Sequence, residues 1–245
     1  MIDLVAGEWL KLRTTRVLYG MVPAAVLLSF AAVAGSVFAT DRADVPLAST
    51  EGLQRVLSVT GAGALVVLLV GILISAGEYR HGTSADTFLT TPRRHRVVVA
   101  KLLLGAAVGL VVGVLTSAAC VGIASLLFSL KGSTFPFGDG DVWLTLGGTL
   151  VYTTLFAVLG VAVGTMVRNQ VLAVALALAW LAIAEHILVG FAPRIGRWLP
   201  AAAGQAIVRT PLDDLLSPVA GGVVLVAYVL VIGAAGIRFA TTRDT

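Results

Sequence analysis

The chain has 245 residues, of which 58% are hydrophobic and only 12% are charged, and its formal net charge is +4. Soluble domains carry about 25% charged residues, so this composition argues against a soluble enzyme and against a disordered chain. The single cysteine, Cys120, excludes an intrachain disulfide and a cysteine-rich metal site. The basic residues form no aromatic-studded face of the kind that binds nucleic acid.

Residues 1–16 precede the first long apolar run. Apolar side chains recur in this segment every three or four positions, at Ile2, Val5, Trp9 and Leu12, which predicts a helix with one apolar face. A short basic helix that carries a tryptophan is typical of a membrane interface. We therefore expect an interfacial helix here, although a generic topology anchor would show the same pattern. The residues assigned to the interface are Trp9, Lys11, Arg13 and Arg16.

Six runs are long enough to cross a bilayer, whose apolar core of about 30 Å takes roughly 20 helical residues. The third run exceeds that length, which predicts tilt or an extra turn outside the bilayer. The first run is longer than the apolar part of a signal peptide, although residues 37–39 resemble a cleavage site. The predicted fold class is an all-α integral membrane protein with a single six-span domain. The spans are 17–40, 56–77, 102–130, 142–167, 171–192 and 215–237.

An even number of spans places both termini on one side of the membrane. If that side is the cytoplasm, the cytoplasmic segments hold 11 basic residues and the external segments hold 6. Cytoplasmic loops are enriched in Lys and Arg. We therefore predict a topology with both termini in the cytoplasm.

The segment 78–96 joins the second and third spans and carries the densest basic cluster, Arg93-Arg94-His95-Arg96. Thr83 or Ser84 can cap a short helix, and Pro92 should end it because the residue before a proline avoids the helical region. Such a helix would project Phe88 and Leu89 toward a soluble partner. A solvated basic loop that only sets the topology would explain the same residues.

The third span carries Gly105, Gly109 and Gly113 at intervals of four. A row of small residues on one helix face permits close helix contact. We expect a packing seam within the chain rather than a dimer interface.

Glu185 and His186 are the only adjacent ionisable pair inside a predicted span. Charge inside a bilayer is costly, so such residues face a cavity, a partner helix or a dimer axis. Glu185 could contact a substrate or shape an outer gate, or it could simply bond a neighbouring helix or the external segment. A proton relay finds little support because the other spans hold no second acidic or histidine layer.

The external segment 193–214 contains Trp198-Leu199-Pro200 and a weakly apolar stretch, 201–208, that is too short to span. It predicts a re-entrant or interfacial helix, or an amphipathic surface loop. Glu185, His186, Trp198 and Pro200 are the candidate residues of a pathway or outer gate.

Several of these segments together resemble the permeases of type-2 ABC exporters. The resemblance lies in Glu78-Tyr79-Arg80-His81-Gly82-Thr83, Leu89, Pro92-Arg93-Arg94 and Lys101-Leu102-Leu103, in the opening stretch 8–16, and in Trp198-Leu199-Pro200. Ser84 and Asp86 depart from the expected pattern, which leaves the register of the helix open. The resemblance implies that 78–96 is a cytoplasmic coupling segment. The residues it assigns to ATPase coupling are Glu78, Tyr79, Gly82, Thr83, Phe88, Leu89, Pro92, Arg93 and Arg94.

The resemblance further implies a permease that works as a homo- or heterodimer, surrounded by membrane lipid and bound to two ABC ATPase subunits. Arginine outnumbers lysine 14 to 3, which we interpret as a sign of a GC-rich bacterial genome, so we expect a bacterial plasma membrane. The sequence has no G-x-x-x-x-G-K-[ST] motif, which is the loop that cradles nucleotide phosphates. We therefore expect no enzyme activity, metal or cofactor in this chain, and ATP–Mg on the partner subunit. The alternatives are an ion- or proton-coupled secondary transporter and a non-transport scaffold or regulatory subunit.

Overall fold

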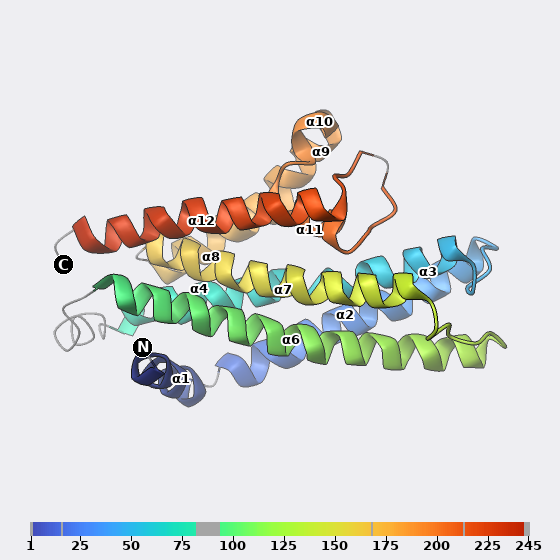
Figure 1. The fold of residues 1–245 in the computed structure, drawn as a ribbon, viewed down its shortest axis with the longest axis horizontal. Helices are drawn as coiled ribbons and strands as arrows, with labels where there is room; N and C mark the ends of the chain where they lie inside the picture. The colour runs from blue at the N-terminus through green and yellow to red at the C-terminus, as the bar shows by residue number, and fades with distance from the viewer. Residues whose placement is uncertain (1, 16, 82–93, 168, 213, 243–245) are drawn as a thin grey trace.

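The computed structural model describes residues 2–15, 17–81, 94–167, 169–212 and 214–242 (Figure 1). Within these ranges every regular element is helical. In chain order the α-helices are α1 (Ile2–Thr14), α2 (Val17–Arg42), α3 (Thr50–Leu57), α4 (Ala64–His81), α6 (Arg94–Leu130), α7 (Gly140–Met166), α8 (Gln170–Leu178), α9 (Glu185–Phe191), α10 (Pro193–Gly196), α11 (Pro200–Ile207) and α12 (Pro218–Thr242). A 3₁₀-helix, η1 (Ser58–Gly63), joins α3 to α4, and a π-helix, η2 (Ala179–Ala184), joins α8 to α9.

The described residues form six candidate membrane spans, as predicted, by helix length and composition. The second starts earlier than expected, at Thr50, because the side chain of Ser49 caps α3 and η1 carries the chain into α4. The third lies in α6, whose 37 residues measure about 55 Å at 1.5 Å per residue. α6 is therefore longer than an apolar bilayer core.

Figure 1 shows both chain termini, α1, the end of α4 and the start of α6 at one end of an elongated bundle. We call this the termini end. The connections from α2 to α3 and from α6 to α7 lie at the opposite end. Helices α10 and α11 connect α9 to α12, so the described residues of the predicted external segment 193–214 include two short helices.

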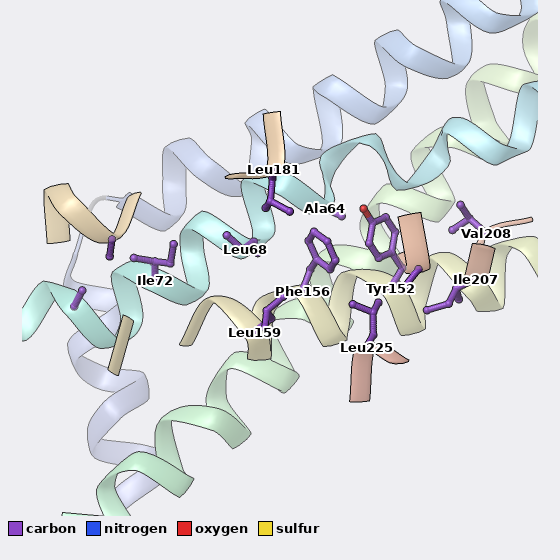
Figure 2. Close-up of a cluster of buried hydrophobic side chains, with 13 residues drawn as sticks. Ala64, Leu68, Ile72, Tyr152, Phe156, Leu159, Leu181, Ile207, Val208 and Leu225 are labelled. Atoms are coloured by element: carbon purple, nitrogen blue, oxygen red, sulfur yellow. The ribbon is translucent and has the colours of Figure 1, made fainter. Parts of the chain in front are cut away.

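Helix α7 occupies the centre of the bundle, where it packs mainly against α4, α6 and α12. Its Tyr152 and Phe156 rings meet edge to face at a centroid distance of 4.5 Å. Figure 2 shows both rings on the side of α7 that faces α4. Leu68 and Ile72 of α4 belong to the same buried cluster.

Glycines bring the helix backbones around α7 into contact. Gly71 of α4 and Gly160 of α7 face each other, and a Cβ at either position would overlap a backbone carbonyl oxygen of the opposing helix. Gly105, Gly109 and Gly113 of α6 lie against α7, around Val161, Ala157 and Thr153. This row of glycines therefore contacts another helix of the same chain, which is the arrangement expected of a packing seam.

Three spans are exposed on most of their surface. Only 22% of the most apolar window is buried in α2, in α8–α9 and in α12, against 56–67% in the other three spans. The exposed side chains include Leu27, Trp180, Ile187 and Leu230. Apolar faces of this extent suit a lipid or protein environment rather than water.

Candidate functional site

At the termini end, helix α1 is held against the bundle by a buried carboxylate. Oε2 of Glu8 accepts a 2.5 Å hydrogen bond from Nζ of Lys101, near the start of α6. Oε1 of Glu8 accepts a 2.8 Å hydrogen bond from Nζ of Lys11. Glu8 is 7% exposed and Lys101 is 4% exposed, so this ion pair lies inside the protein.

The same cluster reaches the last part of α4. Nζ of Lys101 also donates to the backbone carbonyl of Ile74, at 3.3 Å. Leu12 of α1 is buried in an apolar cluster with Ile74 and Leu104. Helix α1 is therefore fixed to α4 and α6, the two helices that flank residues 82–93.

Sequence reasoning did not find the Glu8–Lys101 pair, because its members are 93 positions apart and belong to different predicted elements. Both residues lie within stretches that carried the family resemblance, which was the only available signal.

The structure also shows how the predicted apolar face of α1 is placed. On that face, Leu12 is buried and Trp9 is 47% exposed. Lys11 and Arg13 are exposed, and Arg16 lies outside the described residues.

Most of the predicted coupling residues also lie outside the described part of the chain. Glu78 and Tyr79 stand in the last turn of α4, and Arg94 is the first residue of α6. The others, Gly82, Thr83, Phe88, Leu89, Pro92 and Arg93, fall within 82–93.

The second candidate site surrounds Glu185, the first residue of α9. Glu185 is 1% exposed, and its Oε1 accepts hydrogen bonds from the backbone N–H groups of Ala201 and Ala202, at 2.5 and 3.1 Å. These are the second and third residues of α11, whose N-terminal N–H groups have no partner within their own helix. The carboxylate of Glu185 therefore caps α11 from a different helix.

One carboxylate oxygen of Glu185 is not used in this cap. Oε2 is buried and has no hydrogen-bond partner, and the described residues place no cationic side chain in an ion pair with Glu185.

The π-helix η2 ends directly before Glu185, and π-helical turns are frequent at functional sites. The sequence predicted a continuous span here and showed no sign of this irregular turn.

A cavity of about 440 Å³ lies beside Glu185. Tyr152 and Phe156 of α7 line it together with parts of η1, η2 and α11. His186 also lines it, and its Nδ1 lies 3.1 Å from the carbonyl oxygen of Leu181. A carbonyl oxygen only accepts hydrogen bonds, so Nδ1 carries the hydrogen in this contact.

The structure brings together three of the four residues predicted for the pathway or outer gate. Pro200 is the first residue of α11 and is buried beside the cap that Glu185 makes, and His186 faces the cavity. Trp198 is not among the residues that line the cavity and is 49% exposed, with the guanidinium of Arg197 over its ring. Tyr152, which lines the cavity, was missed because an aromatic residue in an apolar run carries no distinguishing sequence signal.

Six long apolar helices in the described ranges, together with their exposed apolar faces, define a multi-pass membrane protein. The model of the ABC-2 family transporter proteins matches residues 4–183, which is most of the chain, so the protein belongs to this family. No curated protein matches the chain. Membership makes the chain a membrane subunit that is not catalytic itself and that belongs to a family associated with ABC ATPase subunits.

Proposed function

We propose that this chain is the permease subunit of an ATP-driven exporter, and that two permease copies form the substrate pathway while two separate ABC ATPase subunits supply the energy. The observation that carries the proposal is the buried Glu8–Lys101 pair. It links α1 rigidly to α6, and Lys101 also holds α4. A movement imposed on residues 82–93 would therefore pass to three helices together, because packed elements shift as units.

The termini end is the cytoplasmic side in this proposal. Arg13, Arg96 and Arg238 are exposed at that end, which agrees with the positive-inside rule. Trp9 and Leu10 of α1 are 47% and 62% exposed, next to basic residues of the same helix. Exposed apolar and basic side chains on one short helix support an interfacial position in the inner leaflet of a bacterial plasma membrane.

The second permease copy, identical or not, and membrane lipid would share the exposed apolar faces of α2, α8–α9 and α12. ATP–Mg would bind to the ATPase partner. An ion- or proton-coupled mechanism would use charged residues near the middle of the bundle. Among the described residues, Glu8 and Glu185 are the buried acidic side chains. Glu8 lies at the termini end, bonded to Lys11 and Lys101, and Glu185 alone does not form a relay of charged groups, so we do not adopt that alternative.

The test is purification of the tagged protein in mild detergent from native membranes, followed by mass spectrometry of the co-purified proteins. We expect an ABC ATPase in stoichiometric amount. Phe88→Asp and Leu89→Asp should abolish its recovery, because a carboxylate would enter an apolar contact. Phe137→Asp is the matched control, since Phe137 is exposed in the loop before α7 at the opposite end, and it should leave the ATPase bound.

Repeated purification of the protein without any ATPase would contradict the proposal. Recovery of the ATPase with no ATP-dependent transport after reconstitution would favour the scaffold or regulatory alternative. Equal loss of the ATPase in the Phe137→Asp control would show that the first two substitutions act through folding rather than through a docking contact.

A further inference from the structure

The cavity beside Glu185 combines small, apolar and aromatic walls. Ala32, Gly61, Ala62 and Ala182 line it, and their short side chains leave the space open. The Tyr152 and Phe156 rings form an aromatic wall, joined by Leu65, Leu181 and Val208. The volume of about 440 Å³ lies within the range of roughly 300–1,000 Å³ that small-molecule sites occupy.

The polar groups of the cavity lining carry no fixed charge. Ser58, Gln205 and Thr210 supply neutral hydrogen-bonding groups, and His186 adds an imidazole. Among the described residues that line it there is no Lys, Arg, Asp or Glu. An occupant would therefore be mostly apolar and would meet a few neutral polar contacts.

A carboxylate lies behind the wall of the cavity. Glu185 lies between the lining residues Ala182 and His186 in the chain, and Ala201, which also lines the cavity, donates to its Oε1. Its other oxygen, Oε2, is buried without a hydrogen-bond partner. In an apolar interior, charges interact much more strongly than in water, so the ionised form of this carboxylate and a positive charge inside the cavity would stabilise each other.

The aromatic wall has the same preference. The faces of Tyr and Phe rings attract cations that lie over them, and the edge-to-face contact of Tyr152 with Phe156 presents two differently oriented rings. The carboxylate and the aromatic rings therefore both favour a cationic ligand.

We propose that this cavity binds an amphipathic organic cation, a molecule with a bulky apolar body and one positive charge, for which Glu185 is the counter-charge and Tyr152 and Phe156 are the aromatic wall. The assignment of the cavity as a substrate site rests on the proposed function. Binding of the ligand by itself requires no ATPase subunit.

The test uses two ions of the same shape and opposite charge, tetraphenylphosphonium and tetraphenylborate. Binding of each radiolabelled ion to the purified protein is measured by scintillation proximity, without any ATPase. We expect saturable binding of tetraphenylphosphonium and none of tetraphenylborate. Glu185→Gln should weaken the binding of the cation at least about tenfold, while its amide oxygen still accepts from Ala201 and Ala202.

Two further variants test the cavity itself. Ala62→Phe and Ala182→Phe fill it from different walls, and each should abolish binding of the cation. Glu51→Gln is the matched control, because it removes an exposed carboxylate from α3 that does not line the cavity, and its affinity should equal that of the unmodified protein. Thermal unfolding of each variant identifies any that fail to fold.

Equal affinity of the unmodified protein and Glu185→Gln for the cation would overturn the inference, as would binding of both ions alike or no saturable binding of either. If the ATPase co-purifies but the cation does not bind, only this inference fails. If the cation binds but no ATPase associates, the inference stands and the proposed function fails.

Discussion

Nζ of Lys101 donates a 2.5 Å hydrogen bond to Oε2 of Glu8, and this contact joins the N-terminal helix α1 to the start of α6. Lys11 holds the other carboxylate oxygen, so one buried anion stands between two ammonium groups. The arrangement matters because α6 begins directly after residues 82–93, where we propose that an ATPase subunit docks. Helix α1 is thereby part of the frame around the proposed docking segment.

The first prediction concerns this ion pair. Glu8→Gln should lower the free energy of unfolding by about 3 kcal/mol, because it leaves the buried ammonium group of Lys101 without its carboxylate partner. Lys101→Met should cost less, since Glu8 keeps its hydrogen bond to Lys11. Thermal and denaturant unfolding of the purified protein in detergent would measure both.

The control for that experiment is Glu51→Gln, which breaks the exposed pair of Glu51 with Arg55. Exposed ion pairs contribute about 0–1 kcal/mol, so the control should unfold almost as the unmodified protein does. If Glu8→Gln were as mild as the control, α1 would not be held by the pair.

A second prediction follows from the contact between α4 and α7. Gly160→Ala places a methyl group against the carbonyl oxygen of Leu68, and overpacking of this kind costs roughly 1–3 kcal/mol. Gly147→Ala, on the same helix, has open space around the new methyl group and should be neutral or slightly stabilising, because Ala favours helix more than Gly. The melting temperatures of the two variants should therefore shift in opposite directions or by clearly different amounts.

A third prediction separates the two properties of Glu185. Glu185→Ala removes the acceptor for the N–H groups of Ala201 and Ala202, and leaving buried donors without a partner costs about 1–3 kcal/mol. Glu185→Gln keeps an acceptor oxygen and should lose less stability. The cap would be supported if the unfolding curves show the unmodified protein to be the most stable, Glu185→Gln less stable and Glu185→Ala the least stable. Identical curves for the glutamine and alanine variants would contradict it.

A fourth prediction addresses the topology. Cys120 is fully buried, so Cys120→Ala provides a background for added cysteines. Gly138→Cys, in the loop between α6 and α7 at the opposite end, should react with a membrane-impermeant maleimide in intact cells. Arg13→Cys, in α1, should react only after the cells are permeabilised. The reverse pattern would place the termini outside and would remove α1 from the side where ATP is available.

The fold class could be predicted from the sequence because it depends on local properties. Runs of about 20 apolar residues can satisfy their backbone groups within a bilayer only as helices, so six runs indicated six spans. The described part of the chain has six candidate spans. Sequence motifs, including Glu78-Tyr79-Arg80-His81-Gly82-Thr83, were sufficient to indicate the family to which the chain belongs. The proposed coupling segment remains a prediction from these motifs, since 82–93 lie outside the described residues.

The tertiary structure decided which distant residues meet. The sequence singled out Glu185 because charge is rare in a span, but only the packing of α9 against α11 shows that one oxygen caps a helix and the other has no hydrogen-bond partner. Glu8 and Lys101 looked like ordinary charges at helix ends until folding brought them together. The reason is physical: a buried charge is stabilised by partners close in space, and spacing along the chain carries no record of contacts between separate helices.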